Sequence, residues 1–357
     1  MLLFVTMRPH TLPIERRLRN FANLKISVRH FSIARHHVPD IWRSFQGVRL
    51  ALRIGILLSG IFRLRRALKT ITSKDVLFVD AHDALAATLA ARFLSRNRSR
   101  LICQVLDVHY LLLYPSIYRS TLRALERWTL NRIDLLIVPT HGNIDQYYGP
   151  IARFRGEAAV VHNKLPTGEA ANPLPAPSFE GTWVIGWFGS LRCERTLEIL
   201  CRTAELMGSR VKILAAGNCD LPRADFERAI GRHSNILYLG NFHAPNDAAR
   251  LYGQVHIACG LHFEPPDKSK WALAVRILEG GAYGRPAIAR ADSDMGRFVA
   301  DNGTGWTLSE PCEQELPKLL GSLTWESYCR VAARVRDRSD LFIGEDHLVA
   351  ALGSLPA

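Results

Sequence analysis

Leu135-Leu136-Ile137-Val138 is a fully apolar run that follows a helix-like stretch and ends at Pro139. A run without polar alternation is typical of a strand that is covered on both faces, as in a parallel sheet. Similar runs recur on both sides of it, separated by helical patterns. The predicted strands of this half are Leu2–Thr6, Ile26–Phe31, Val76–Asp80, Leu101–Leu106, Leu135–Pro139 and Ala159–Val161. This alternation predicts a doubly wound α/β fold.

The stretch 165–181 (LPTGEAANPLPAPSFEG) has four prolines and little periodicity, which favours a linker between domains. Strand and helix patterns then resume at Trp183–Phe188. We therefore predict a first Rossmann-like domain over 1–164, a linker over 165–181 and a second Rossmann-like domain over 182–324. The helical tail, 325–357, could pack back on the first domain. Ligands of such folds bind at the carboxyl ends of the strands, here in a cleft between the two domains.

The net charge of +13 is concentrated near the N-terminus. Residues 1–75 hold 15 Lys/Arg and 3 Asp/Glu, or +12, and the rest holds 31 and 30, or +1. Segment 41–74 combines basic and apolar residues, which predicts an amphipathic helix on an anionic membrane surface. The alternative is a core helix with a solvated basic face. The basic residues expected at the membrane are Arg49, Arg53, Arg63, Arg65 and Arg66.

Other composition features narrow the class of protein. Charge confined to one segment, with few aromatics and no binding motif, argues against nucleic acid as a partner. Seven scattered cysteines without a CxxC pair predict neither a metal site nor a disulfide framework, and favour the reducing cytoplasm. The longest apolar stretch, Ile54–Phe62, is too short to span a bilayer. We expect a cytoplasmic protein that binds the inner face of the membrane peripherally.

The segment Gly186–Leu200 (GWFGSLRCERTLEIL) resembles a phosphate-binding turn. A strand ends near Gly189, and Arg192 and Arg195 precede or begin a helix. Glycine lets a phosphate approach the backbone, the helix N-terminus attracts it, and arginine offsets its charge. The hypothesis is a diphosphate site. A tight turn with two solvated arginines is the alternative.

The segment Asp267–Ala289 (DKSKWALAVRILEGGAYGRPAIA) carries further candidates. Lys270 lies in a loop before a helix, and Glu279 lies on that helix. Glycines lower helix propensity, so Gly280 and Gly281 indicate a packing or ligand requirement. A carboxylate such as Glu279 can accept hydrogen bonds from a ribose diol. The alternative is a helix end with a surface glutamate.

In the first half, Asp107 and His109 follow one predicted strand, and His82 and Asp83 follow another. Strand carboxyl ends are where active-site residues of α/β folds lie. A single histidine is more often structural, but two His/Asp pairs at equivalent positions favour a catalytic role.

Several of these stretches together resemble the family-4-like glycosyltransferases of the GT-B fold. VRILEGGAYGRPAIA is similar to their donor-site helix, and GWFGSLRCERTLEIL and NILYLGNFHAPNDAARLYGQVHIA to the elements before it. VLDVHYLLL, RALERWTLNRIDLLIVPT and VVHNK resemble the N-domain of a subgroup that acts in bacterial exopolysaccharide assembly, including succinoglycan-type enzymes. The resemblance covers roughly residues 75–310.

The resemblance implies a retaining transfer of a hexose from a nucleotide sugar, with UDP-glucose as the guess, and no obligatory metal or other cofactor. The acceptor would be a glycan or a polyprenyl-linked oligosaccharide. Arg192 and Arg195 match positions that face the donor diphosphate, Glu279 the ribose contact, and His109, with Asp107 beside it, the catalytic position near the transferred sugar. Trp271 stands where the family has a first glutamate. This departure keeps open a non-catalytic GT-B protein that binds nucleotide or glycan.

Overall fold

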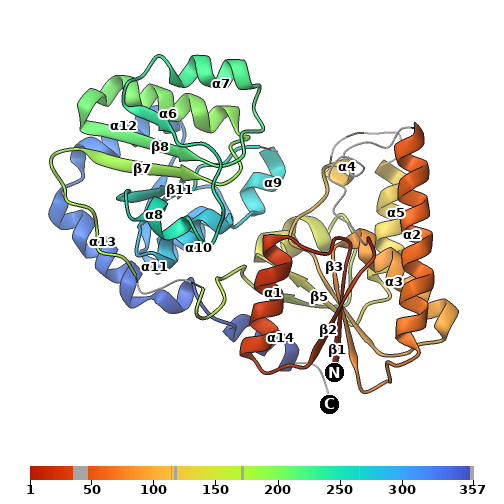
Figure 1. Cartoon of the computed structure of the whole chain (residues 1–357). Helices are drawn as coiled ribbons and strands as arrows, with labels where there is room; N and C mark the ends of the chain where they lie inside the picture. The colour runs from red at the N-terminus through yellow and green to blue at the C-terminus, as the bar shows by residue number, and fades with distance from the viewer. Residues whose placement is uncertain (35–46, 114, 116–118, 170–172, 265, 354–357) are drawn as a thin grey trace. The chain divides into compact units, whose positions relative to one another are not determined.

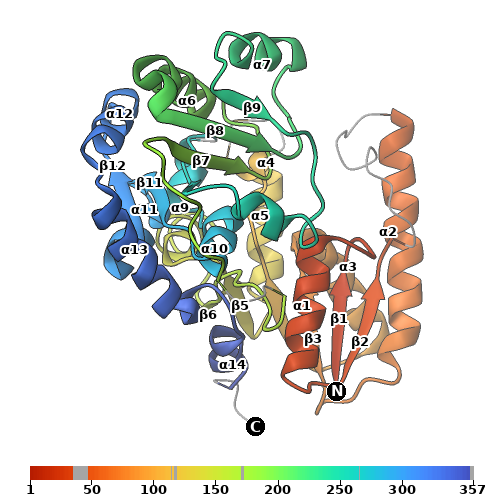
Figure 2. The same cartoon turned by 60° about the vertical axis from the view of Figure 1, so that its left-hand side comes forward.

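The computed structural model describes residues 1–34, 47–113, 115, 119–169, 173–264 and 266–353. The chain divides into two compact units (Figures 1 and 2). The first unit contains Met1–His162 and Glu345–Ala357, and the second contains Asn163–Gly344. Each unit is an α/β layer structure built on a parallel sheet, which confirms the predicted fold class.

The first unit has, among its described residues, a six-stranded parallel sheet in the order β2-β1-β3-β4-β5-β6. The strands are β1 (Leu2–Thr6), β2 (Val28–Ser32), β3 (Val76–Asp80), β4 (Arg100–Gln104), β5 (Leu135–Val138) and β6 (Glu157–Val160). All five residues of β1 are buried, because this strand pairs on both sides and is covered on both faces. Strand order reverses next to β1, which makes a switch point between β1 and β3.

Helices cover both faces of this sheet. They are α1 (Leu12–Asn23), α2 (Gly47–Leu68), α3 (His82–Ser95), α4 (Tyr110–Leu113), α5 (Arg119–Leu130), the π-helix η2 (Asn143–Tyr148) and α14 (Asp346–Gly353). Figure 1 shows α2, α3 and α5 on one face and α1 and α14 on the other. Edge-to-face contacts among Phe4, Phe21 and Phe78 lock α1 onto the sheet.

The second unit repeats the design, with a described sheet ordered β12-β11-β10-β7-β8-β9, all parallel. Its strands are β7 (Trp183–Phe188), β8 (Val211–Ala216), β9 (Ile236–Tyr238), β10 (Ile257–Cys259), β11 (Ala287–Arg290) and β12 (Gly305–Leu308). The switch point lies between β7 and β10, so the loops after these two strands are the expected ligand position.

The helices of the second unit are α6 (Glu194–Met207), η3 (Gly208–Arg210), α7 (Arg223–Ile230), α8 (Ala248–Tyr252), α9 (Pro266–Trp271), α10 (Val275–Ala282), α11 (Asp294–Asn302), α12 (Cys312–Ser322), α13 (Trp325–Asp337) and η4 (Ser339–Leu341). In Figures 1 and 2, α6 and α12 lie together on one face of the sheet, and α8 and α10 lie on the other.

The unit boundaries differ from the predicted domain boundaries. The described part of 165–181 belongs to the second unit: Leu165 is buried and bridges to Ile343, and Phe179 stacks on Trp325. Prolines here extend the chain along the second unit, where apolar contacts hold it. The chain returns to the first unit at Glu345, and Leu348 of α14 packs in that unit's core.

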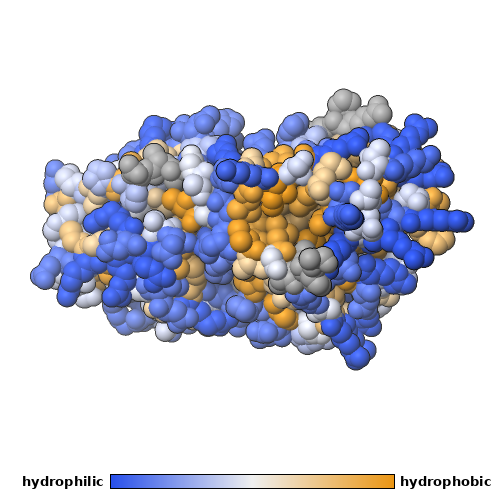
Figure 3. All heavy atoms as spheres, turned by 90° about the horizontal axis from the view of Figure 1, so that it is seen from below, coloured by the Kyte–Doolittle hydropathy of each residue, from blue (hydrophilic) through white to orange (hydrophobic). Residues whose placement is uncertain are grey.

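Among the described residues, no helix has the length and apolar content needed to cross a membrane. The helix predicted in segment 41–74 is observed as α2 over Gly47–Leu68, and residues 41–46 lie outside the described part. Figure 3 shows one apolar area on the lower face of the molecule, surrounded by mainly hydrophilic side chains.

Candidate active site

The loops that follow β7 and β8 meet at the carboxyl edge of the second sheet. Gly189 follows β7 with a φ of 106°, and Gly217 follows β8 with a φ of 127°. Glycine adopts such conformations without strain. A Cβ on Gly217 would lie 1.8 Å from the carbonyl oxygen of Gly189, so the two loops can meet only if residue 217 has no side chain. Arg192 follows at the end of the β7 loop.

Arg276 of α10 joins this loop. Its Nη2 donates a hydrogen bond to the carbonyl oxygen of Ser190 at 3.0 Å, whereas its Nη1 is buried and has no hydrogen-bond partner among the described residues. Burial lowers the pKa of Arg276, and the charge of Arg192 lowers it further. Within the described part of the chain, neither arginine forms an ion pair. Arg192 is exposed and Arg276 is partly buried, with its Nη1 closed to solvent. A cation with a buried nitrogen and no counter-charge is costly, which favours an anionic ligand.

His262 follows β10, and its pKa reflects the electrostatic potential of the charges around it. Burial lowers the pKa of His262, and the charges of Arg276 and Arg192 add to that effect. Lys268 and Arg290 act in the same direction, which brings the pKa to about 3. The imidazole is therefore neutral at pH 7. Several cations around one buried neutral group create a positive potential that attracts anions such as a diphosphate.

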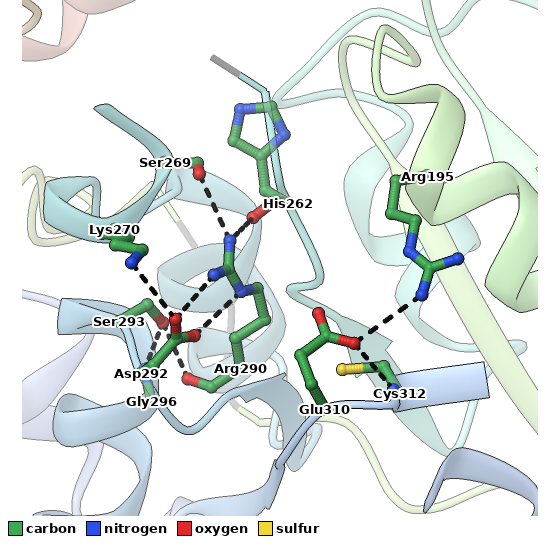
Figure 4. Close-up of polar contacts among 10 residues, drawn as sticks. All are labelled: Arg195, His262, Ser269, Lys270, Arg290, Asp292, Ser293, Gly296, Glu310 and Cys312. Carbon is green, nitrogen blue, oxygen red and sulfur yellow. Dashed lines mark hydrogen bonds and ion pairs between the residues drawn. The ribbon is translucent and has the colours of Figure 1, made fainter. Parts of the chain in front are cut away.

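Arg290, the last residue of β11, ties the surrounding loops together (Figure 4). Its guanidinium donates to both carboxylate oxygens of Asp292, at 3.0 and 2.8 Å. It also donates to the carbonyl oxygen of His262 at 3.2 Å and to Ser269 Oγ at 3.3 Å. Asp292 thus neutralises Arg290, which fixes α9 and the loop after β10 in place. Arg192 and Arg276, for which the described residues show no ion pair, are available to a ligand.

Glu279 lies one turn after Arg276 on α10 and is buried. The Tyr252 hydroxyl, from α8, donates to the carbonyl oxygen of Arg276 at 3.2 Å and lies 3.5 Å from Glu279 Oε2. Tyr252 in turn stacks on Tyr283. Arg192, Arg276 and Glu279 therefore belong to one region, in which a carboxylate lies beside a cationic group. This arrangement suits a ligand that has both a diphosphate and a diol.

Arg195 of α6 is paired with carboxylates. Its Nη2 lies 2.5 Å from Glu313 Oε2 of α12. Figure 4 shows its second contact, at 3.7 Å from Glu310 Oε2, just before α12. Burial lowers the pKa of Arg195, but the charges of Glu313 and Glu310 outweigh burial and raise it above the ordinary value. The role of Arg195 at the diphosphate stays a prediction, but these two acids already balance its charge, and the local sequence does not reveal them.

Contacts within the protein account for three other predicted donor residues, Lys270, Gly280 and Gly281. Lys270 is half exposed, and its Nζ lies 3.6 Å from Asp292 Oδ2. A Cβ on Gly280 would lie 2.7 Å from the Ala258 side chain, and one on Gly281 would lie 2.2 Å from the Phe342 ring. Close packing of α10 therefore accounts for both glycines without a ligand.

In the first unit, Asp107 and His109 are exposed in the loop after β4, as predicted for strand-end residues. His109 Nδ1 accepts a hydrogen bond from the Leu111 backbone at 3.3 Å, at the start of α4. The second predicted pair separates. Asp83 Oδ2 lies 3.7 Å from an Arg53 nitrogen, whereas His82 points towards α5.

The basic residues of α2 do not all face solvent. Arg53 is buried beside Asp83, and Arg63 donates to the carbonyl oxygen of Ile33, so both bind the protein rather than a membrane. Arg65 and Arg66 are exposed as predicted. The side chain of Arg49 lies outside the described part of the structure.

In the described residues, no group of three or more His, Cys, Asp or Glu side chains could hold a metal ion. Sequence reasoning missed Arg276, His262 and Arg290. Arg276 has a signal in the sequence, since it precedes Glu279 by three positions and so shares its helix face. The other two come together only through the order of β10 and β11.

Comparisons with known proteins agree with this architecture. No family model matches the chain. It is 28% identical to the succinoglycan biosynthesis protein ExoL of Rhizobium meliloti (strain 1021) over 295 residues, which cover 80% of this chain and 73% of ExoL. Anabaena HepE in complex with UDP and glucose is similar at a TM-score of 0.70 and 15% identity, with 99% of both chains covered. The apo form of the lipopolysaccharide outer core galactosyltransferase WaaB has a TM-score of 0.64 and 14% identity, again with 99% of both chains covered. The fold is therefore GT-B, the fold of these glycosyltransferases.

Proposed function

We propose that this GT-B protein, similar in sequence to ExoL, is a glycosyltransferase of exopolysaccharide biosynthesis that takes a sugar from a UDP-linked donor. The observation that carries the proposal is the unpaired cationic environment around neutral His262, formed by Arg276 and Arg192 at the switch point of the second sheet. HepE, with a similar fold, is described in complex with UDP and glucose, which favours the same donor class here.

In the proposed reaction the bond between the anomeric carbon and the donor diphosphate breaks, and its electron pair goes to the phosphate oxygen. Arg276 and Arg192 would stabilise the charge that develops there. They are held before the reaction, Arg276 by Ser190, so little reorganisation is needed. The acceptor hydroxyl then bonds to the anomeric carbon, and its proton leaves with the diphosphate. Retention of configuration, a hexose as the transferred sugar, and catalysis without a metal remain part of the proposal.

Replacement of Arg276 tests the assignment. Loss of one preorganised donor to a developing oxyanion typically costs about 10²–10³ in rate, so Arg276→Gln should lower kcat by that factor. Arg195→Gln is the matched control: it also removes a guanidinium, but one that Glu313 and Glu310 already neutralise. The measurement is release of UDP from UDP-glucose in the presence of a cell-extracted lipid-linked acceptor. Equal loss in both variants, or none in Arg276→Gln, would contradict the assignment.

The alternative is a GT-B protein that binds its nucleotide without transfer. Trp271, where the family has a glutamate, keeps this alternative relevant. Binding and turnover separate the two functions. A thermal-shift measurement with UDP at about 100 times its Kd should add about 2.7 kcal/mol of stability in either case, but only an enzyme transfers the sugar.

The acceptor is proposed to be a glycan or a polyprenyl-linked oligosaccharide, reached from the cytoplasmic face of the membrane. Ile54, Leu58 and Phe62 recur every four residues on α2 and are 49%, 51% and 55% exposed. This spacing puts them on one helix face, which Arg65 and Arg66 follow. Exposed apolar side chains beside basic ones favour an anionic lipid surface, with each basic residue contributing about 1 kcal/mol.

Liposome flotation tests the membrane surface. The protein should float with vesicles that contain phosphatidylglycerol and stay behind with pure phosphatidylcholine, and Phe62→Ser should weaken flotation. Leu206→Ser, also at an exposed apolar position but on α6, is the control. Equal binding to both kinds of vesicle would exclude the charge-dependent interaction.

A further inference from the structure

His262 and Phe263 follow β10 and are held by different elements of the second unit. Arg290, at the end of β11, donates to the carbonyl oxygen of His262, and its guanidinium lies over the Phe263 ring, 4.4 Å from the centroid. On the other side, the backbone N–H of Phe263 donates to Cys193 Sγ at 3.3 Å, directly before α6. The backbone that carries the His262 side chain is thus fixed between the end of β11 and the start of α6.

The imidazole of His262 is the part of this segment that remains available to a ligand. Figure 4 shows the ring directed away from the Arg290 guanidinium, which donates to the carbonyl oxygen of His262. Among the described residues, neither ring nitrogen forms a hydrogen bond. Only 7% of the residue is exposed, yet neither nitrogen is closed to solvent. Most buried polar groups are hydrogen-bonded, so these two nitrogens indicate a role towards a ligand.

The loop after β7 places two cations beside the imidazole. Arg192 directly precedes Cys193, whose thiol holds the segment after β10, and Arg276 donates to the carbonyl oxygen of Ser190 in the same loop. Burial lowers the pKa of His262, and Arg276 and Arg192 lower it further, so the imidazole is neutral. A neutral imidazole has one donor and one acceptor nitrogen, whereas an arginine side chain only donates. His262 therefore adds a hydrogen-bond acceptor to a region of donors.

Arg276 is a neighbour of both Glu279 and His262. It precedes Glu279 by one turn of α10, and after burial its charge is the largest cause of the lowered pKa of His262. The Tyr252 hydroxyl, from the helix before β10, lies 3.5 Å from Glu279, whereas His262 follows β10. A nucleotide sugar has its diphosphate between the ribose and the transferred sugar. With the diphosphate at Arg276 and the ribose at Glu279, the transferred sugar comes to lie at His262.

We infer that His262 binds a hydroxyl group of the transferred sugar and is a specificity-determining residue for the donor. The acceptor nitrogen of the neutral imidazole takes the hydrogen bond from that hydroxyl, whose oxygen can still accept from a neighbouring cation. Asp292 does not replace it, because both of its carboxylate oxygens already accept from Arg290. The inference rests on the proposed function for the UDP-linked donor and adds the residue that recognises its sugar.

The test is calorimetric binding of UDP-glucose and UDP-galactose to the full chain, with UDP as the reference ligand that lacks the sugar. The donor that binds the wild type more tightly is compared with its deoxy analogues, each of which lacks one hydroxyl of the transferred sugar. For one analogue, wild-type affinity should fall about five- to tenfold, the value of one hydrogen bond.

His262→Phe completes the cycle. The parent donor should lose the same factor in this variant, and removal of the critical hydroxyl should then cost no more than about twofold, because both changes delete one interaction. UDP should bind the wild type and the variant within about twofold of each other. A purely structural role of His262 would instead change UDP and the UDP-hexose alike.

His256→Phe is the matched control. It makes the same replacement at the opposite end of β10, where His256 is 1% exposed and its Nδ1 accepts from the Val184 backbone at 3.0 Å. Loss of that hydrogen bond should lower the unfolding temperature. The critical deoxy analogue should nevertheless still bind about five- to tenfold more weakly than its parent. The same loss of discrimination in both variants would overturn the inference, because reduced stability would then explain it.

Other results would also overturn the inference. They are equal binding of all deoxy analogues to the wild type, undiminished discrimination in His262→Phe, and an equal loss of UDP and UDP-hexose in that variant. If UDP binds and neither UDP-hexose does, the role of His262 is refuted and the nucleotide assignment stands. If UDP itself fails to bind the wild type, the proposed function fails, and the inference fails with it.

Discussion

The low native pKa of His262 predicts how the stability of the protein depends on pH. Its native pKa is about 3, and the ordinary value is 6.5. The unfolded chain therefore binds a proton below pH 6.5 that the native state does not bind, so native stability falls as the pH falls from 6.5 towards 3. Each pH unit costs 1.36 kcal/mol for one proton, so the change from pH 6.5 to 5 removes about 2 kcal/mol.

This magnitude depends only on a native pKa below 5, so it does not require an accurate value. Other histidines and acids also titrate in this range, and they must be cancelled. We therefore compare wild type with His262→Gln by urea unfolding at pH 7 and pH 5. The wild type should lose about 2 kcal/mol more than the variant. Lys268 and Arg290 remain in both proteins, so the difference isolates the imidazole.

The bound nucleotide should change this result. A diphosphate offsets the charges of Arg276 and Arg192, which lets the pKa of His262 rise. In saturating UDP the extra loss at pH 5 should therefore shrink. An identical pH dependence in wild type and His262→Gln, without nucleotide, would refute the lowered pKa of His262. An extra loss that UDP leaves unchanged would refute the contribution of Arg276 and Arg192 to it.

Three further changes have outcomes that follow from the structure. Gly217→Ala should destabilise the protein by about 1–3 kcal/mol in urea unfolding, because the new Cβ would meet Gly189 O; Gly240→Ala, with a φ of 80° and open space, should cost less. Asp80→Asn should raise the free energy of unfolding at pH 7 by up to about 3 kcal/mol. The native pKa of Asp80 is about 6 and the ordinary value is 3.8, so ionising this carboxyl destabilises the native state as the pH rises from 3.8 through 6. A variant that is stabilised no more at pH 7 than at pH 4, measured by urea unfolding, would contradict this. Glu279→Gln should weaken UDP more than inorganic diphosphate in calorimetry, because its carboxylate would contact the ribose, and equal weakening would remove it from that role.

The periodic part of the sequence predicted the fold well, because strands such as Leu135–Val138 are apolar throughout and are buried on both faces. The bounds of helices and strands were predicted less well where contacts between distant residues determine them. Lys270 was predicted in a loop before the helix of Glu279, whereas the structure has Lys270 in the short helix α9 and Glu279 in α10, with Leu273 between the two helices. The elements α11, β12 and α12 were not predicted from the sequence.

The site shows the same division. Arg192 and Glu279 could be named as candidates, because one lies in a recognisable turn and the other on a recognisable helix. The ion pair of Arg195 could not be predicted from sequence, since Glu313 lies 118 residues away and reaches it only through the packing of α6 on α12. His262 could not be found either, because the charge of Arg290 reaches it across neighbouring strands.

The two units have opposite electrostatics at equivalent strand ends. In the second unit, burial lowers the pKa of His262 to about 3, and the charges of Arg276 and Arg192 act in the same direction. In the first unit, burial raises the pKa of Asp80 to about 6, although Arg17 and Gln104 oppose the shift. The carboxyl edge of the second unit's sheet is thus positive, whereas that of the first unit's sheet carries acidic side chains. A positive edge attracts an anionic diphosphate and an acidic edge repels it, whereas net charge discriminates neither for nor against a neutral sugar. The diphosphate of the proposed donor is therefore favoured at the edge of the second unit and disfavoured at that of the first.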